Sequence, residues 1–285
     1  MGIHALTAGY FDAIAGMEKL LGCRIFIVGG YVRDSILKKE SRDIDFCVEG
    51  DGIGVARALH ERSGGVLTVH KKFLTATLKP KDGVTLDFAT ARTETYPAPA
   101  AMPAVKPATL RDDLRRRDFT INAIAIPLSE ASRPKIPDAL IDPCGGYRDI
   151  KSGIVRVMHE KSFTDDPTRV LRAVRYAVRF GFCIESRTME LLRRAVGQDL
   201  LGLVSAPRLR DEFTKALEED KAKKIFTEFE EMGILKHFGD NFDISELSPS
   251  AETPEIRLKK LLGNYTPAEK NAFVKKFCLP VGIAG

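Results

Sequence analysis

The stretch that decides the fold is IFIVGGYVRDSIL, residues 25–37, which is followed by DIDF at residues 43–46. The β-branched run RIFIV, residues 24–28, predicts a buried strand. Two glycines end this run, and YVRDSILKK then predicts a helix. DIDFCV, residues 43–48, predicts a second strand. A plain turn needs neither a second glycine nor two aspartates two positions apart, so this stretch indicates a site for phosphate and metal.

Asp43 and Asp45 lie two apart on a predicted strand, so both side chains project from one face, roughly 6–7 Å apart along it. Such a pair is costly unless a cation lies between the carboxylates, and Mg²⁺ binds through one or two carboxylates plus substrate phosphates. Gly29 and Gly30 lack Cβ atoms, so a triphosphate can approach the backbone N–H groups there. Arg33, in the first turn of the helix, is predicted to complete the phosphate cradle.

Asp87, in VTLDFA at residues 84–89, is a candidate third carboxylate from a neighbouring strand. A two-metal phosphoryl-transfer site needs such a group near the attacking hydroxyl. The alternative, an ordinary acid at the end of a strand, stays open at this point.

The element pattern predicts an α+β fold, with a small mixed sheet in the first half and helices in the second. The residues of the first half that predict a helix are 8–21 and GIGVARALHERS, and those that predict strands include 66–70, 73–79 and 84–89. The predicted helices of the second half cover 166–180, 186–197, 206–218 and 221–231. Within the first half, PAPAAMPAVKPA at 97–108 holds four prolines and predicts an extended loop with neither helix nor central strand.

The composition is ordinary for a globular protein, and the positive net charge mildly favours anionic partners. The net charge is +5, and the five cysteines form no C-x-x-C pair. That pattern argues against a disulfide framework or a structural zinc site and favours a cytoplasmic location. No apolar run approaches a membrane span, and the first residues do not resemble a signal peptide, so we expect no membrane partner.

Five motifs together resemble class II tRNA nucleotidyltransferases, the bacterial and eukaryotic CCA-adding enzymes and their poly(A) polymerase relatives within the DNA polymerase β superfamily. They occur in order over about residues 20–240, as VGGYVRDSIL, DIDF, RRDFTINAIAI, DPCGGYRDI and DDPTRVLRAVRYAVRFGF. The resemblance implies a nucleotidyltransferase head at residues 1–138, a helical neck with base recognition at 139–205, and a helical body that contacts tRNA at 206–285. Relatives commonly extend well past 285 residues, so the chain is either a minimal form or a truncated one.

The resemblance also implies roles for single residues. In RRDFTINA, it assigns Arg117, Asp118 and Asn122 to the nucleotide pocket and the ribose. In DPCGGYRDI, it implies a mainly structural role, with Asp142 and Asp149 fixing a hinge. In SAPRLRDEF, residues 205–213, Arg208 and Glu212 are spaced to pair along one helix.

The helix predicted at 166–180 carries an apolar stripe, which predicts core, and an arginine stripe on the opposite side. The family motif Glu-Asp-x-x-Arg appears here as Asp165-Asp166-Pro-Thr-Arg169, with Asp in place of the first Glu. A carboxylate accepts from the exocyclic amine of cytosine or adenine, and a guanidinium reaches the adjacent ring acceptors. Uracil and guanine place a carbonyl where a carboxylate repels it. We therefore expect Asp166 and Arg169 to read the base, with Arg172 and Arg175 of the same stripe also binding the nucleotide.

The function so predicted is template-independent addition of C and/or A to a tRNA 3′ end from CTP and ATP, with two Mg²⁺ ions and release of pyrophosphate. Four alternatives stay open: an A-only enzyme, a CC-only enzyme, a poly(A) polymerase, and a catalytically inactive RNA-binding relative. The loop before RRDF favours an enzyme that can add adenine. Intact Asp43, Asp45, Asp166 and Arg169 argue against an inactive relative.

Overall fold

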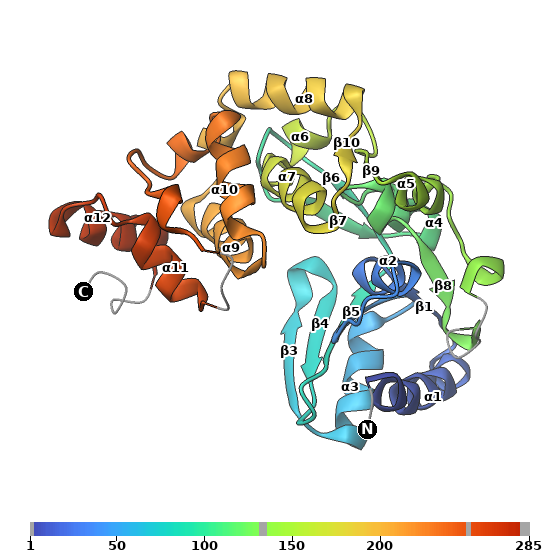
Figure 1. The fold of residues 1–285 in the computed structure, drawn as a ribbon. Helices are drawn as coiled ribbons and strands as arrows, with labels where there is room; N and C mark the ends of the chain where they lie inside the picture. The colour runs from blue at the N-terminus through green and yellow to red at the C-terminus, as the bar shows by residue number, and fades with distance from the viewer. Residues whose placement is uncertain (1–2, 131–135, 249–251, 280–285) are drawn as a thin grey trace. The chain divides into compact units, whose positions relative to one another are not determined.

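The computed structural model describes residues 3–130, 136–248 and 252–279, and the chain divides into two compact units. The first unit comprises residues 1–95 and 103–152, and the second comprises 96–102 and 153–285. Within the described residues, no helix is both long enough and apolar enough to span a bilayer. The predicted α+β class is confirmed, because the sheet lies in the first unit and most of the second is helical (Figure 1).

The first unit is built on a six-stranded mixed sheet with the strand order β3-β4-β5-β2-β1-β8. Its strands are β1 Arg24–Val28, β2 Asp43–Glu49, β3 Val66–His70, β4 Thr75–Lys79, β5 Thr85–Thr90 and β8 Ala125–Pro127. Its helices are α1 Ile3–Leu21, α2 Gly30–Ile36, α3 Gly52–Ser63, α4 Leu110–Arg115 and α5 Gly146–Ser152, with short 3₁₀ turns η1 Lys71–Phe73, η2 Thr120–Asn122, η3 Leu128–Glu130 and η4 Ile136–Ala139. Only β2 and β5 run parallel, and each of the other neighbouring pairs is antiparallel.

The core of this unit lies on one face of the central strands. Phe46 of β2 stacks on Phe88 of β5, and the edge of the Phe11 ring, from α1, meets Phe46. Since side chains alternate along a strand, this apolar face leaves Asp43 and Asp45 on the opposite face of β2. Helix α3 packs along β3, β4 and β5 (Figure 1).

The proline-rich segment differs in part from its prediction. Ala104–Pro107 forms strand β7, which pairs with β6, Arg92–Thr95, in a separate two-stranded ladder. Prolines are tolerated at the edge of a sheet, where the missing N–H removes no ladder bond. The prediction of an extended loop is therefore wrong for Ala104–Pro107, whereas the exclusion of a helix and of a central strand agrees with the structure.

The second unit consists mainly of packed helices. They are α6 Ser162–Asp165, α7 Thr168–Phe180, α8 Ser186–Gly197, α9 Ala206–Glu218, α10 Ala222–Glu231, α11 Pro254–Leu261 and α12 Pro267–Phe277, with β9 Ile154–Val155, β10 Cys183–Ile184 and the 3₁₀ turns η5 Leu200–Leu203, η6 Leu235–His237 and η7 Ile244–Glu246. The predicted helices at 186–197 and 206–218 agree with α8 and α9 at both ends. Aromatic rings from α9, α10 and α12 form the core, with Phe213 contacting Phe226 and Phe273.

Buried ion pairs join α7 to α9 in this unit. Glu212 Oε2 lies 3.0 Å from Arg175 Nη2, and its Oε1 lies 3.3 Å from Arg172 Nη1 and 2.9 Å from Lys215 Nζ. Burial by itself raises the pKa of Glu212, but these three cations outweigh it and lower the pKa to about 2. The predicted pairing of Glu212 with Arg208 is not found. Glu212 turns toward α7, where two guanidinium groups can surround it.

We expect Glu212→Gln to destabilise the protein at neutral pH and much less at low pH. The folded pKa of about 2 lies below the ordinary value of 4.5, so the carboxylate stabilises the fold above pH 4.5 and loses this effect as the pH falls toward 2. The expected loss at pH 7 is on the order of 3 kcal/mol. Urea unfolding at several pH values measures it, with Glu218→Gln on the exposed face of α9 as the control. A deficit that is the same at pH 7 and pH 3 would contradict the assignment.

Candidate active site

The parallel register of β2 and β5 brings three carboxylates to one face of the sheet. Asp45 lies directly opposite Asp87, and Asp43 lies opposite Thr85. Thr77, opposite Asp87 on β4, donates its hydroxyl hydrogen bond to the Asp87 carboxylate. The predicted third carboxylate is therefore the cross-strand neighbour of the DxD pair, and a threonine orients it.

The electrostatics of these carboxylates favour a bound cation. The pKa of Asp45 is raised to about 6. Burial is the largest cause, Arg117 opposes the rise, and the negative charges of Asp87 and Asp43 add to it. Burial also raises the pKa of Asp87, although the hydrogen bond from Thr77 counters this effect. A positive ion beside these oxygens would remove both the desolvation cost and the repulsion between like charges.

The donor set fits a hard divalent ion such as Mg²⁺. Across residues 3–130, 136–248 and 252–279, no group of three His, Cys, Asp or Glu side chains is arranged to hold a metal by itself. Mg²⁺ commonly takes only one or two carboxylates from a protein and completes its shell with water and substrate phosphates. Asp43 and Asp45 supply such a pair of oxygen donors on one strand face.

The glycine turn closes tightly over this site. Gly29 has φ 70° and ψ −131°, a conformation open essentially only to glycine. A methyl group at Gly29 would lie 2.9 Å from Arg117 Nη1 and 3.1 Å from Asp45 Oδ2. The backbone N–H of Gly30 hydrogen-bonds to the Asp45 carboxylate. The turn therefore places the N–H of Gly30, the first residue of α2, against the Asp45 carboxylate, and it leaves no room for a side chain at Gly29.

A chain of hydrogen bonds links the other predicted pocket residues of this unit. Arg33, which is buried, donates from Nη1 to Asn122 Oδ1 at 2.5 Å and from Nε to Asp34 Oδ1 at 2.9 Å. Asn122 Nδ2 in turn donates to Asp118 Oδ1 at 3.0 Å. Arg117 Nη1 donates to the Asn122 carbonyl at 3.3 Å. The structure thus brings Arg33, Arg117, Asp118 and Asn122 together beside the glycine turn.

Sequence reasoning missed Asp113, which holds this network in place. Its side chain is fully buried, and Oδ2 accepts from Arg117 Nη2 at 3.0 Å while Oδ1 accepts from Arg116 Nη2 at 2.6 Å. Oδ1 also accepts from the backbone N–H of Arg92 at 3.3 Å. Asp113 stands in α4 one helical turn before the arginine pair, and that spacing was the available signal.

The segment DPCGGYRDI, residues 142–150, packs against η2 and hydrogen-bonds to it. A Cβ on Gly146 would lie 2.0 Å from the Thr120 carbonyl oxygen, and Asp149 Oδ2 accepts from the Thr120 hydroxyl at 2.7 Å. Asp142 accepts the backbone N–H groups of Gly146 and Tyr147 at 2.8 and 2.9 Å, and so caps α5. These contacts are structural. The hinge role that was predicted for Asp142 and Asp149 stays a prediction.

The remaining predicted site residues lie in the second unit, around the start of α7. Helix α7 begins at Thr168, so Asp166 precedes it instead of occupying its first turn. Asp166 Oδ1 accepts from the Thr168 N–H at 3.0 Å, from the Thr168 hydroxyl at 2.6 Å and from Arg208 Nη2 at 2.8 Å. Among the described residues, no hydrogen bond reaches Oδ2. The side chain of Arg169 is buried.

Arg172 and Arg175 are turned toward α9. Besides their ion pairs with Glu212, Arg175 Nη1 lies 3.3 Å from Glu219 Oε1 and Arg172 Nη2 donates to the Tyr176 hydroxyl at 3.2 Å. The predicted role of these two arginines in nucleotide binding stays a prediction.

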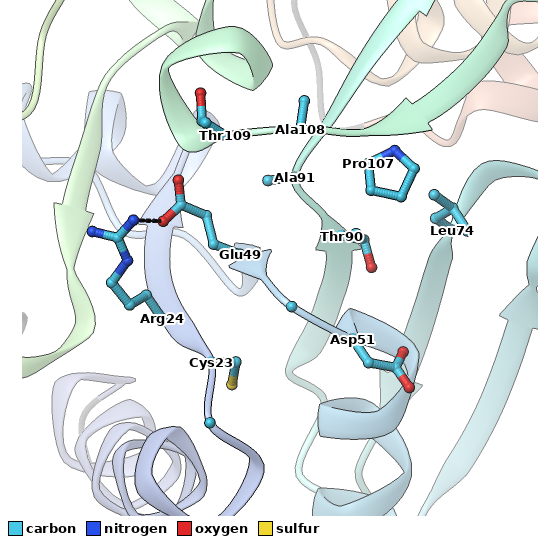
Figure 2. A pocket seen from close by; sticks show the side chains of 12 residues that line it. Cys23, Arg24, Glu49, Asp51, Leu74, Thr90, Ala91, Pro107, Ala108 and Thr109 are labelled. Carbon is cyan, nitrogen blue, oxygen red and sulfur yellow. Dashed lines mark ion pairs between the residues drawn. The ribbon is translucent and has the colours of Figure 1, made fainter.

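A separate pocket of about 730 Å³ opens at the other end of the sheet (Figure 2). It is lined by residues after the ends of β2 and β5, such as Asp51 and Ala91, and by Pro107 and Thr109 beyond them. Figure 2 shows the ion pair between Arg24 and Glu49 in its wall. None of the predicted site residues lines this pocket.

Comparison with known proteins identifies the family of this chain. Residues 25–156 match the family described as "Poly A polymerase head domain", and residues 181–242 match "Probable RNA and SrmB- binding site of polymerase A". A solved tRNA nucleotidyltransferase, complexed with a primer tRNA and an incoming ATP analog, aligns with a TM-score of 0.77 and 35% identity, over 95% of this chain and 81% of that one. The chain belongs to the tRNA nucleotidyltransferase and poly(A) polymerase family.

Two curated relatives are similar over much of the chain. The A-adding tRNA nucleotidyltransferase of Aquifex aeolicus is 44% identical over 78% of this chain and 26% of its own length. The CC-adding tRNA nucleotidyltransferase of Deinococcus radiodurans is 44% identical over 54% of this chain and 40% of its own length. The chain therefore spans about a quarter of the first relative and less than half of the second.

We expect Gly29→Ala to disrupt the site, whereas Gly30→Ala leaves the fold intact. At Gly29 a methyl group meets Arg117 and Asp45 and forces a non-glycine residue into a positive φ, at a cost of about 2 kcal/mol or more. At Gly30 the nearest atom is Arg33 Nη2 at 3.5 Å, an ordinary contact. Thermal unfolding of the two variants measures the difference. Equal stability of the two variants would show that the turn adapts to a side chain.

Proposed function

We propose that this protein is a template-independent tRNA 3′-end nucleotidyltransferase that adds C and/or A from CTP and ATP and releases pyrophosphate. The observation that carries the proposal is the register that sets Asp45 beside Asp87, under the Gly29 turn and the Arg117 guanidinium. The names of the relatives and the match to a structure with primer tRNA support it. We divide the chain into a catalytic head at 1–138, a neck at 139–205 and a tRNA-contacting body at 206–285, acting in the cytoplasm.

In this reaction the 3′-hydroxyl of the tRNA gives up its proton to solvent and its oxygen forms a bond to the α-phosphorus of the nucleotide. The bond between the α-phosphorus and the oxygen that bridges to the β-phosphate breaks. Two Mg²⁺ ions, when bound, activate the hydroxyl and stabilise the charge on the leaving pyrophosphate. Asp43 and Asp45 would hold these ions. Asp87, oriented by Thr77, would face the attacking hydroxyl from the neighbouring strand.

The protein groups around the carboxylates would bind the nucleotide itself. Gly29 and Gly30 let the triphosphate approach the backbone, and Arg33 lies in the first turn of α2 beside them. Arg117, Asp118 and Asn122 form a pre-organised surface for the ribose, because each is already fixed by a hydrogen bond. Asp166 and Arg169 would read the base.

The relatives favour adenine addition without deciding the full range of products. The Aquifex relative, named for adding A, aligns over more of this chain than the Deinococcus relative, named for adding CC. One experiment separates the possibilities: tRNAs that end before CCA, after C and after CC are incubated with CTP and ATP in separate reactions. Growth only of the CC-ended primer with ATP identifies an A-adding enzyme, and long adenine tails identify a poly(A) polymerase.

We expect Asp45→Ala and Asp43→Ala to lower the rate of transfer by more than about a hundredfold, because each removes one of the two carboxylates proposed to hold the metal ions. The variants should keep the circular dichroism spectrum of the parent protein. Glu40→Ala, an exposed acid just before β2, is the matched control and should retain full activity. If either aspartate variant kept more than a few per cent of the activity, the metal assignment would be wrong.

We further expect Asp166→Asn to shift base selection toward uracil and guanine. The amide keeps an acceptor for Thr168 and Arg208, but presents N–H donors in place of the second carboxylate oxygen. The ratio of kcat/KM for CTP and ATP to that for UTP and GTP should fall by roughly 5- to 150-fold. Glu190→Gln, at an exposed acid of α8, is the control and should leave the ratio unchanged. An unchanged ratio would place base recognition elsewhere.

A further inference from the structure

The polar face of the sheet continues past the three carboxylates onto strands β4 and β3. Asp87 lies opposite Thr77 of β4, and Thr77 lies opposite Thr68 of β3. Residues directly opposite one another in a sheet project from the same face, so these three side chains form one row with Asp45. Neighbouring strands are about 4.8 Å apart, so the row extends roughly 10 Å beyond Asp87. Figure 1 shows β4 and β3 as the outer strands on this side of the sheet (Figure 1).

Other polar side chains flank this row. His70 of β3 lies opposite Thr75 of β4, and Lys79 stands at the other end of β4 on the same face. The side chains of Thr68, His70 and Lys79 are exposed. This part of the sheet, which we call the threonine face, consists of Val66, Thr68, His70, Thr75, Thr77 and Lys79.

The threonine face is opposite in charge to the carboxylates beside it. Neither β3 nor β4 contains an acidic residue, and Lys71 and Lys72 follow β3 in the η1 turn. Burial is the largest influence on the pKa of Asp87 and raises it, whereas the positive charges of Lys79 and His70 lower it. These two side chains therefore lie close enough to Asp87 to attract an anionic group placed next to it.

The ligand that fits this combination is the ribose–phosphate backbone of a single RNA strand. Lysine and histidine side chains contact phosphates whatever the base, and threonine hydroxyls bond to phosphate oxygens and to the ribose 2′-hydroxyl. The triphosphate of the incoming nucleotide is assigned to the Gly29 turn, which follows β1 on the other side of the carboxylates. The strand that carries the attacking hydroxyl must therefore leave the site on the side of Asp87, where the threonine face begins.

We propose that the threonine face binds the ribose–phosphate backbone of the primer strand, next to its attacking 3′-hydroxyl. This inference rests on the proposed function, because a nucleotidyltransferase brings an RNA 3′ end to Asp87. Contacts to the backbone fix the register of a strand and carry no sequence information. The threonine face therefore holds RNA ends of different sequence in one position and leaves base selection to the groups that contact the incoming nucleotide.

The first test measures RNA binding without catalysis. A fluorescein-labelled acceptor-arm RNA that ends in CC is titrated with the full chain in EDTA at several salt concentrations, and fluorescence anisotropy gives Kd. Lys79→Ala should raise Kd about three- to tenfold and lower the slope of log Kd against log salt by roughly 0.7, the value for one phosphate contact on a single strand. Lys19→Ala is the control and should change neither, because α1 packs on the apolar face of the sheet. An unchanged slope in Lys79→Ala would overturn the proposal.

The second test separates the primer from the nucleotide. Thr68→Val keeps the shape of the side chain and removes its hydroxyl, so it should raise KM for the tRNA primer about two- to tenfold and leave KM for the nucleotide unchanged. Thr68→Ser retains the hydroxyl and is the matched control, which should keep the KM of the parent protein for the primer. Thr77 is unsuitable for this test because it also bonds to Asp87. An equal rise in both KM values, or equal effects of Thr68→Val and Thr68→Ser, would overturn the proposal.

The two tests separate this inference from the proposed function. If the parent protein transfers no nucleotide to any primer while Lys79→Ala weakens RNA binding and its salt dependence as expected, the proposed function fails and the RNA-binding role of the threonine face stands. If the parent protein transfers nucleotides while neither Lys79→Ala nor Thr68→Val alters KM for the primer, the proposed function stands and this inference is overturned.

Discussion

The parallel pairing of β2 with β5 is the constraint on which the first unit depends. It sets Asp45 beside Asp87 on the face that the apolar core does not use, while Phe46 and Phe88 stack on the other face. One register therefore determines both the core and the site, because a slip of one residue would exchange the two faces. Asp45 and Asp87 cannot move apart without breaking the Phe46–Phe88 stack, because both pairs lie on the same two strands. Positive charge near the two carboxylates is therefore needed to offset their repulsion.

Arg117 offsets part of the negative charge of these carboxylates. Arg117 lowers the pKa of Asp45, yet burial and the nearby acids still raise it to about 6. Arg117 is itself neutralised by Asp113, a buried carboxylate whose own pKa is lowered, against the effect of burial, by Arg117 and Arg116. Arg117 is thus shared between Asp45 and Asp113, and the face of β2 keeps an excess of negative charge that favours a cation.

Local patterns predicted the elements well but did not predict their long-range partners. The strands around the glycine turn and the helices α8 and α9 follow from periodicity and turn residues, and the DxD spacing predicted that Asp43 and Asp45 share one strand face. The role of Asp113 depends on the packing of α4 against β2, and Arg208 bonds to Ala100, 108 positions earlier in the chain. Helices α11 and α12 were missed although each begins with Thr-Pro, a start signal that the weak apolar pattern beyond residue 240 obscured.

The arginine stripe of α7 shows why composition alone cannot assign a role. Arg175 and Arg172 turn toward Glu212, and Arg179 lies 3.3 Å from Glu219, so this part of the stripe fastens α7 to α9. The same helix pair carries Arg208 to Asp166 at the start of α7. Because the ion pairs fix the distance between the two helices, they also fix how far Arg208 must reach. Asp166 lies outside any helix, and the rigid packing of α7 against α9 fixes the position of its carboxylate through Arg208.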